Sequence, residues 1–224
     1  MESLTTSDIM VLIPIKDFSK TKTRIKARLP SKHKLVVEKL VEATFHQTLH
    51  LLNRSRLSFG VISPSRVIIE TSQQLGAQFT YLDKGTDLNE ALSQATKKLP
   101  LDKPILIVMP DLPFLSFDFL TTLQEKTKDL DLLIVPSISG ESGNVGTAMM
   151  YMRNPNLTSF HFGKNSNIQH QKEAQKLNLR YQILDVDPYA RDLDTLTDLQ
   201  YLQQHLKMVN EPNRFESILE NIFC

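Results

Sequence analysis

Three aspartates, in two separate stretches of the chain, are candidates for holding a divalent cation. Asp111 follows the apolar run 105–109, which is typical of a short buried strand, so its carboxylate lies where open α/β sheets bind ligands. Asp192 and Asp194 alternate with Leu193, and an extended segment would direct both carboxylates to one side. Such oxygens suit Mg²⁺, which often bridges to phosphates. Taken singly, an aspartate in the position of Asp111 is more often a turn former or helix N-cap than a metal ligand, and the N-cap of the following helix is the alternative role for Asp194.

A group of cations follows the first apolar run, residues 9–15. Residues 16–28 contain six Lys or Arg side chains and one acid, and Lys16, Lys22 and Arg24 are among the cations. The loop after the first strand of an α/β fold faces the ligand crevice, and phosphoryl transfer needs cations there because charge builds on the phosphate oxygens. The stretch contains no glycine, which excludes a Walker A loop and a dinucleotide fingerprint. A solvated basic loop is the alternative.

A third group consists of small and hydroxyl-bearing residues later in the chain, Thr147, Gly163 and Ser166. They suit close approach to a small anion, and Ser166, expected to cap a helix, would add free N–H groups and the helix dipole. Ordinary turn and cap chemistry explains the same residues and is favoured when they are taken alone. His170, four residues after Ser166, is expected to be structural or surface-exposed rather than a catalytic base.

The elements that must position these groups alternate along the first half of the chain. The sequence predicts strands at 9–15, 57–63, 79–82, 105–109 and 132–136, separated by helices at 31–53, 65–75, 88–98 and 116–128. This alternation predicts a parallel sheet with helices on both faces. Beyond residue 136 the pattern changes to a glycine-rich loop at 139–146, strands at 147–152 and 180–186, helices at 166–177 and after 195, and an amphipathic tail at 211–224.

Composition sets limits on the class of protein. A chain of 224 residues suits one domain, 1–224, with residues 1–8 as a flexible N-terminus. A net charge of +1 gives no argument for nucleic acid or membrane binding, and no apolar run approaches the ~20 residues of a membrane span. The single cysteine, Cys224, excludes an internal disulfide and fits a reducing cytoplasm.

Five segments match one set of motifs in the same order along the chain. Residues 14–25 match P-V-K-x-x-x-x-A-K-S-R-L at its charged positions, 87–92 match G-L-N-x-A-L, 110–115 match D-L-P-L-L, 162–170 match F-G-P-G-S-F-x-x-H, and 193–199 match L-D-(V/I)-D-T-x-x-D-L. Together they resemble the 2-phospho-L-lactate and phosphoenolpyruvate guanylyltransferases of coenzyme F-420 biosynthesis, which are related to the MobA-like nucleotidyltransferases.

The resemblance implies a fold and a reaction. The fold would be α/β, a Rossmann-like three-layer nucleotidyltransferase fold whose mostly parallel sheet has an antiparallel strand in its C-terminal half. The reaction would transfer GMP from GTP to the phosphate of 2-phospho-L-lactate and release pyrophosphate, with Mg²⁺ as cofactor. A homodimer in the cytoplasm is also implied.

The resemblance assigns roles to residues of this chain. The residues expected to be catalytic are Lys16, Lys22, Arg24 and Asp111; the metal ligands are Asp111, Asp192 and Asp194; the acid substrate would be bound by Thr147, Gly163 and Ser166; and GTP would be contacted by Asn89.

This chain departs from the family motifs at a few positions. Asp87 replaces a glycine, Ala148 an asparagine, Lys164-Asn165 a Pro-Gly pair and Asn167 a phenylalanine. All but the first fall around the expected acid site, so phosphoenolpyruvate and 3-phosphoglycerate stay open as alternative acids. A nucleotide-sugar glycosyltransferase and a non-catalytic nucleotide-binding homologue are the other hypotheses; the cationic loop argues against the first, and the retained carboxylates argue against the second.

Overall fold

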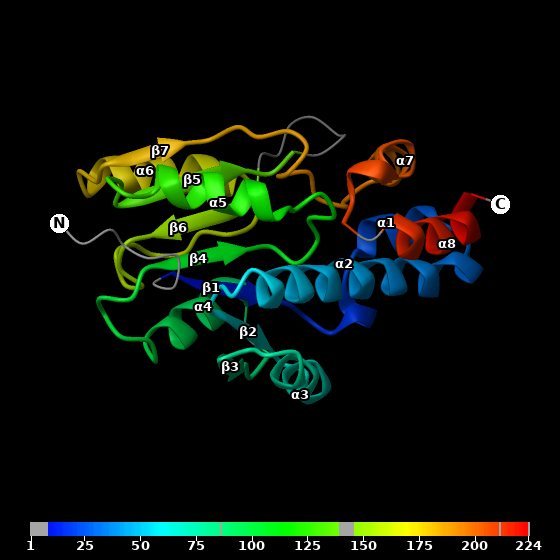
Figure 1. Cartoon of the computed structure of the whole chain (residues 1–224), viewed down its shortest axis with the longest axis horizontal. Helices are drawn as coiled ribbons and strands as arrows, with labels where there is room; N and C mark the ends of the chain where they lie inside the picture. The colour runs from blue at the N-terminus through cyan, green and yellow to red at the C-terminus, as the bar shows by residue number, and fades with distance from the viewer. Residues whose placement is uncertain (1–8, 86, 139–145, 211, 224) are drawn as a thin grey trace.

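The computed structural model describes residues 9–85, 87–138, 146–210 and 212–223, which form a layered α/β structure around a seven-stranded sheet (Figure 1). The strands are β1 (Met10–Pro14), β2 (Phe59–Ser63), β3 (Phe79–Leu82), β4 (Ile105–Val108), β5 (Leu132–Pro136), β6 (Thr147–Met152) and β7 (Tyr181–Ile183), in the order β3-β2-β1-β4-β6-β5-β7. Only β6 runs antiparallel to its neighbours β4 and β5 among these strands. The predicted fold, mostly parallel with an antiparallel strand in the C-terminal half, is confirmed.

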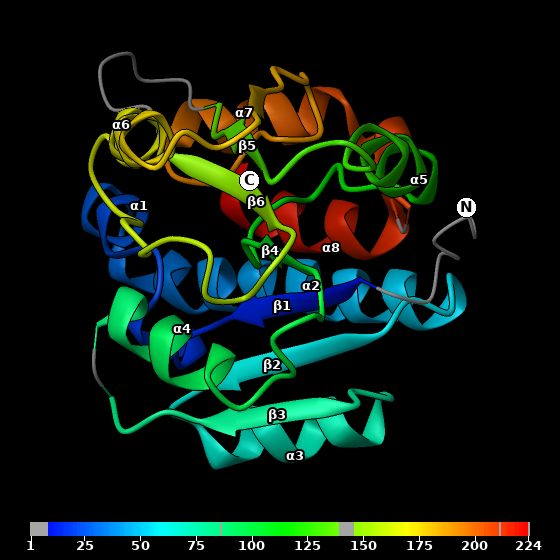
Figure 2. The ribbon, with the colours of Figure 1, turned by 90° about the vertical axis from the view of Figure 1, so that its left-hand side faces the viewer.

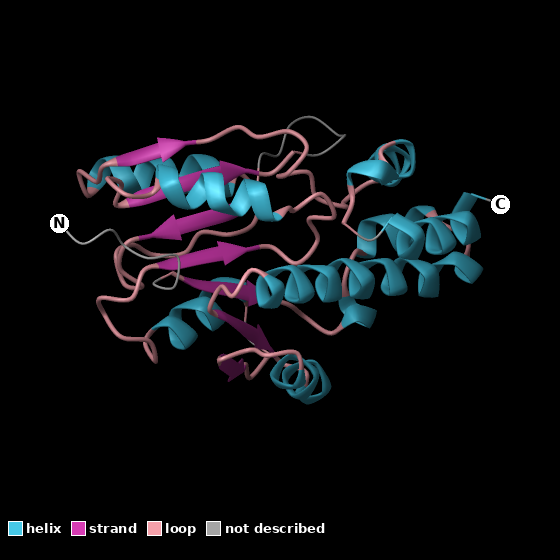
Figure 3. Cartoon of the chain, in the orientation of Figure 1, coloured by secondary structure: helices cyan, strands magenta, loops and turns pink. Residues whose placement is uncertain are grey.

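Helices cover both faces of this sheet (Figures 2 and 3). The helices are α1 (Thr23–Arg28), α2 (Lys34–Arg54), α3 (Arg66–Gln74), α4 (Leu88–Thr96), α5 (Phe117–Lys126), α6 (Ser166–Lys176), α7 (Leu196–Gln204) and α8 (Pro212–Phe223). Apolar side chains of α2, α3 and α5 pack on one face, and those of α4 and α6 pack on the other.

Strands β1, β4 and β5 are buried on both faces because their side chains are apolar at every position and alternate in direction, whereas the edge strands β3 and β7 are partly exposed. In β1, Val11 and Ile13 contribute to the core under α2, whereas Met10 and Leu12 contribute to the core under α4. The continuous apolar runs read from the sequence therefore supply two cores rather than one.

A third apolar cluster joins α2 to the helices gathered at one end of the molecule (right in Figure 1). Val37 and Leu40, in the first half of α2, are buried in the same cluster as Phe215 and Leu219 of α8. Ile25 of α1 belongs to it as well. The basic segment after β1 is thus attached to a packed helical layer.

Some boundaries differ from the predicted ones. Strand β7 covers Tyr181–Ile183 instead of 180–186, because only Tyr181, Gln182 and Ile183 pair with β5. The predicted flexible N-terminus, 1–8, and residues 139–145 of the glycine-rich loop lie outside the described residues. Among the helices that are described, none is both long and apolar enough to cross a membrane.

Candidate active site

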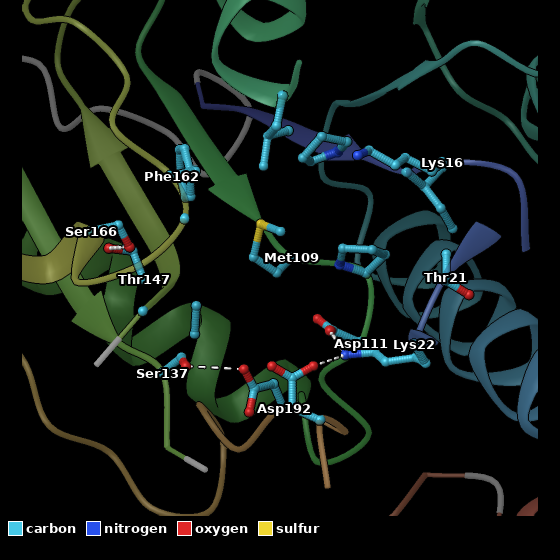
Figure 4. Close-up of a pocket in the computed structure, with 18 of the residues that line it drawn as sticks. Lys16, Thr21, Lys22, Met109, Asp111, Ser137, Thr147, Phe162, Ser166 and Asp192 are labelled. Atoms are coloured by element: carbon cyan, nitrogen blue, oxygen red, sulfur yellow. Dashed lines mark hydrogen bonds and ion pairs between the residues drawn. The ribbon is translucent and has the colours of Figure 1, made fainter. Parts of the chain in front are cut away.

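A cavity of about 560 Å³ opens at the carboxyl ends of β1 and β4, in the volume range of small-molecule sites. The chain runs from β1 outward to β2 and β3 and then returns to the other side of β1 as β4, so this edge is the topological switch point of the sheet. Residues from every predicted group line the cavity: Lys16, Lys22, Asp111, Thr147, Gly163, Ser166, Asp192 and Asp194. Figure 4 labels six of them, Lys16, Lys22, Asp111, Thr147, Ser166 and Asp192. The structure brings these predicted residues together; their roles stay predictions.

Lys22 is the centre of the charged side of the cavity. Its Nζ contacts Oδ2 of Asp111 and lies 2.5 Å from Oδ1 of Asp194. Burial alone would lower the pKa of Lys22, but the neighbouring carboxylates outweigh the burial and raise that pKa above its ordinary value. The ammonium therefore stays charged and holds two of the three carboxylates together.

The third carboxylate, Asp192, lies deeper than the other two. Ser137 Oγ donates to its Oδ2 at 3.0 Å. Burial, followed by repulsion from the Asp111 and Asp194 carboxylates, raises the pKa of Asp192 to about 7. Within the described part of the chain, Oδ1 of Asp192 and Oδ1 of Asp111 have no hydrogen-bond partner although both are buried.

These orphaned oxygens bear on the expected magnesium site. In the described residues no three acidic, His or Cys side chains converge to hold a metal ion as they stand, and the Lys22 ammonium bridges two of the carboxylates. The donor set nevertheless fits a hard cation, since all its atoms are carboxylate oxygens and two of them lack partners. A metal ion and Lys22 would compete for the same oxygens.

Local sequence explains why Asp194 is available to the cavity. The N-cap of α7 is Thr195, whose side chain accepts from the Asp198 backbone N–H while the Asp198 carboxylate accepts from the Thr195 backbone, a complete capping box. Asp194 is therefore not the cap, which was the alternative reading of the Asp192–Asp194 pattern. Arg191 anchors the segment further, with its guanidinium 4.0 Å from the Tyr201 ring centroid.

Side chains from two other parts of the chain hold the loop that carries Asp111 through hydrogen bonds. Gln47 of α2 donates from Nε2 to the Pro113 carbonyl at 2.7 Å, and Asn210 donates to the Leu115 carbonyl at 2.8 Å. Proline at 113 fixes one backbone dihedral of this turn. Helix α2 thus fixes the Asp111 loop as well as covering the sheet.

The remaining cations of the basic segment have different surroundings. Lys16 and Lys20 are exposed and line the cavity rim, whereas Lys26 is buried and donates to the Ser19 carbonyl and to Glu38, both at 2.8 Å. Lys26 therefore ties the segment to α2 rather than facing the cavity. The side chain of Arg24 lies outside the described residues, so its expected contact with a triphosphate stays a prediction.

The opposite side of the cavity is neutral and rich in hydrogen bonds. Thr147 begins β6 and Ser166 begins α6, and Ser166 Oγ donates to Thr147 Oγ1 at 3.0 Å (Figure 4). The predicted role of Ser166 as helix cap is wrong, because the N-cap is Asn165 in the left-handed conformation. Gly163, with φ of +132°, supplies a backbone conformation that few other residues adopt.

His170 lies behind this pair, as its predicted structural role requires. Its Nδ1 is 3.1 Å from Thr147 Oγ1, and its Nε2 accepts from the His161 backbone N–H at 2.9 Å. Burial, and next to it the charge of His161, lower the pKa of His170 to about 4. The ring is therefore neutral at pH 7.

Asn89 does not line this cavity. Its Oδ1 accepts from the Phe162 N–H at 2.6 Å and its Nδ2 donates to the Phe162 carbonyl at 3.0 Å. Both polar atoms of the side chain are occupied by one backbone, so Asn89 ties α4 to the segment before Gly163. Its expected contact with GTP stays a prediction that this arrangement does not favour.

The departures from the family motifs have local explanations. Asp87 caps α4 by accepting from the N–H groups of Asn89 and Glu90, a role that the expected glycine could not fill with a side chain. Ala148 is 1% exposed in the strand core, and Lys164 is exposed on the cavity rim. The Lys164 departure thus adds a cation next to the neutral side.

Sequence reasoning missed Ser137, Gln47 and the contacts of His170. Ser137 follows β5 directly, so the rule that strand ends meet at the ligand edge would have found it. Gln47 lies among apolar residues of a long helix, and no sequence signal distinguishes it. The link from His170 to Thr147 joins α6 to β6 and could be known only from the fold.

The site and the sheet topology together indicate a class of protein. The sheet topology, with cations and carboxylates at its switch point, is that of the nucleotidyltransferase fold. A family model described as "Guanylyl transferase CofC like" matches residues 9–214, and the chain belongs to that family. It is accordingly a nucleotidyltransferase.

Curated proteins of similar sequence carry names that fit this family. A 2-phospho-L-lactate guanylyltransferase of Methanocaldococcus sp. (strain FS406-22) is 28% identical over 191 residues, which cover 84% of this chain and 78% of that protein. A phosphoenolpyruvate guanylyltransferase of Sphaerobacter thermophilus is 29% identical over 206 residues, 88% of this chain and 93% of that protein.

Solved structures share the fold at lower identity. A putative nucleotide-diphospho-sugar transferase from Desulfovibrio desulfuricans G20 superposes with a TM-score of 0.72 at 17% identity, covering 96% of this chain and 94% of that one. A 4-diphosphocytidyl-2C-methyl-D-erythritol synthase from Anaerococcus prevotii gives a TM-score of 0.56 at 12% identity, with coverage of 90% and 99%.

The Asn89 bridge predicts a local effect on the loop that it holds. In Asn89→Ala the Phe162 amide loses its acceptor, so its hydrogen exchange should accelerate, and the loss of two hydrogen bonds should lower the free energy of unfolding by about 1–2 kcal/mol. Exchange mass spectrometry of the peptide around Phe162 and urea unfolding measure both effects. Ser93→Ala, one turn further along α4, should change neither; unchanged exchange in Asn89→Ala would contradict the bridge.

The shifted pKa of His170 predicts a pH dependence of stability. The pKa of His170 in the folded protein, about 4, lies below its ordinary value of 6.5. Between these two pH values the unfolded chain therefore binds more protons than the folded protein. Stability should be fully present above pH 6.5 and fall as the pH drops toward 4. Between pH 7 and pH 4.5 the wild type should lose roughly 2 kcal/mol more than His170→Gln, compared by urea unfolding. Parallel losses in both proteins would mean that His170 is not the titrating group.

Proposed function

We propose that this protein transfers GMP from GTP to the phosphate of a small phosphorylated carboxylic acid, 2-phospho-L-lactate, and releases pyrophosphate, in coenzyme F-420 biosynthesis. The observation that carries the proposal is the division of one cavity into a charged side, around Lys22 and three carboxylates, and a neutral donor-rich side, around Thr147 and Ser166. A triphosphate and a small anion need these two environments. The curated relatives named for this reaction support it.

The chemistry requires the chain to orient two anions rather than to activate a nucleophile. A phosphate oxygen of the acid attacks the α-phosphorus of GTP, a new P–O–P linkage forms, and the bond from the α-phosphorus to the pyrophosphate oxygen breaks. The attacking oxygen is already anionic, so no general base is needed. Positioning and stabilisation of charge on the phosphate oxygens then account for catalysis.

The cations of the basic segment would stabilise that charge. Lys16 and Lys20 reach the cavity rim from the segment after β1, and Lys22 reaches its interior. Mg²⁺, held by Asp111, Asp192 and Asp194, would neutralise charge on the phosphate oxygens. The Lys22 ammonium would then be released from Asp111 and Asp194 and be free to meet a phosphate.

Phosphoenolpyruvate is the second candidate acid, because relatives of comparable identity carry that name. 3-Phosphoglycerate is a third, since Lys164 replaces a neutral residue beside the expected acid site. Incubation with Mg²⁺, each nucleoside triphosphate and each of the three acids, with product identification by mass, distinguishes them. Pyrophosphate release from GTP in the absence of any sugar acceptor would exclude the glycosyltransferase reading, and GTP binding without any product would support a non-catalytic homologue. The expected homodimer stays a prediction.

Loss of the Asp111 charge should abolish turnover. In Asp111→Asn the side chain keeps its shape, but one of the carboxylates that bind Lys22, and would bind Mg²⁺, becomes neutral. GMP transfer should fall by about 100-fold or more, as is typical when a charge-stabilising group is removed. Asp118→Asn, at an exposed position of α5, is the matched control and should keep wild-type activity. Near-normal transfer by purified Asp111→Asn would refute the assignment.

Competition between Lys22 and the metal can be measured without turnover. In Lys22→Met the carboxylates lose their internal cation, so Mn²⁺ should bind more tightly in the absence of nucleotide, whereas Asp192→Asn should weaken binding. Electron paramagnetic resonance of free Mn²⁺ measures both affinities. Lys164→Met removes the same charge from the rim and should leave Mn²⁺ affinity close to that of the wild type. Unchanged affinity in both Lys22→Met and Asp192→Asn would exclude metal binding by these carboxylates.

A further inference from the structure

The two ring nitrogens of His170 have fixed and different roles. The His161 backbone N–H can only donate, so Nε2 of His170, 2.9 Å away, must present a lone pair. A neutral ring with a lone pair on Nε2 carries its hydrogen on Nδ1. Since Nδ1 lies 3.1 Å from Thr147 Oγ1, the ring donates to the threonine hydroxyl. His170 is 1% exposed, so water does not replace either hydrogen-bond partner of the ring.

This tautomer determines whether the hydroxyls of Thr147 and Ser166 present a hydrogen-bond donor to the cavity. The two hydroxyls carry two hydrogens, and the 3.0 Å contact between them uses one. The other would be consumed if Thr147 donated to His170, but the Nδ1–H excludes that. One O–H of the pair is therefore left to donate, and both residues line the cavity.

The opposite tautomer would reverse the character of the site. Thr147 would then donate to Nδ1 and Ser166 would donate to Thr147, so the pair would face the cavity with lone pairs alone. Lone pairs repel carboxylate and phosphate oxygens, which only accept hydrogen bonds. A buried donor, by contrast, is stabilised by such an anion.

We propose that His170 is a positioning residue: held by the His161 backbone, it forces the Thr147–Ser166 pair to act as a hydrogen-bond donor to an anionic oxygen of the acid substrate. This rests on the proposed function for the identity of that substrate. The ring itself does not meet the substrate, since both of its nitrogens are engaged within the protein. A neutral ring also avoids a permanent buried charge that would bind any anion without discrimination.

The tautomer can be observed directly in the unmodified protein. Long-range proton–nitrogen correlation spectra of protein with ¹⁵N-labelled histidine report which ring nitrogen carries the hydrogen. The expected result at pH 7 is a neutral ring protonated at Nδ1. A ring protonated at Nε2, or at both nitrogens, overturns the proposal whatever the enzyme catalyses.

Three variants test the consequence for binding. His170→Asn can place an amide N–H close to the position of Nδ1, whereas His170→Gln reaches the position of Nε2 and loses the donor to Thr147. The acid KM should rise about tenfold or more in His170→Gln and recover largely in His170→Asn, with the KM for GTP unchanged in both. His161→Gln should keep the acid KM of the wild type, because the hydrogen bond that orients His170 comes from the backbone N–H of residue 161. Equal acid KM values in His170→Asn and His170→Gln would indicate a merely structural residue and refute the proposal.

Failure of this proposal and failure of the proposed function give different results. Phosphoenolpyruvate binding, followed by chemical-shift titration, needs no turnover. Binding that weakens in His170→Gln but not in His170→Asn supports the positioning role even if no GMP is transferred. GMP transfer by a wild type whose His170 is protonated at Nε2 supports the function and refutes the positioning role.

Discussion

The arrangement of the site depends on the balance of charge around the Lys22 ammonium. Three carboxylates from two distant stretches of chain meet at one edge of the sheet, and without a cation their mutual repulsion would oppose folding. Lys22 contacts two of them, and the third, Asp192, carries a pKa raised to about 7. The protein thus stabilises a concentration of negative charge with one cation of its own. That cation occupies the oxygens that a divalent metal would use, so under the proposed function the surroundings of Lys22 would change when phosphates and metal bind together.

The fold makes this balance possible because each participant is fixed by a separate element. Lys22 precedes the short helix α1, Asp111 follows β4, and Asp192 and Asp194 precede α7. Helix α2 connects these parts, since it binds the Asp111 loop through Gln47 and packs against both α1 and α8. A substitution in α2 that disturbs packing would therefore shift the Asp111 loop at the cavity, although α2 contributes no side chain to the cavity lining.

Much of the fold could be predicted from local patterns of apolar residues in the sequence. Much of the site could be predicted from the rule that ligands bind at the carboxyl ends of parallel strands. The apolar run before Asp111 is a strand because an apolar segment of this length must be buried on both faces, and the alternation with helices predicted that it is parallel to its neighbours in the first half of the chain. The apolar run that begins at Thr147 is also a strand, but it lies beyond that alternation and runs antiparallel to β4 and β5. What the sequence did not reveal were contacts between elements far apart in the chain. The prediction that Ser166 caps α6 failed because Asn165 adopts the left-handed conformation, which releases the Ser166 hydroxyl to pair with Thr147. Asn89 was likewise read as a ligand contact because its partner, the Phe162 backbone, lies 73 residues away.

Under the proposed function, the two sides of the cavity would recognise anions by different physical means. On the side of Lys22 the attraction would come from the full charges of Lys16, Lys20 and Lys22, which act on a phosphate with little dependence on its shape. On the side of Thr147 it is a neutral hydroxyl with a single available hydrogen, whose direction is set by the buried His170. Hydrogen bonds of this kind discriminate by geometry, because a misplaced oxygen leaves a buried donor unpaired at a cost of about 1–3 kcal/mol. In the proposed reaction the charged side would hold the triphosphate and the neutral side would select the acid. Lys164, on the rim of the neutral side, adds a charge where the family motif has none, so under the proposed function it is the departure that changes the charge beside the acid.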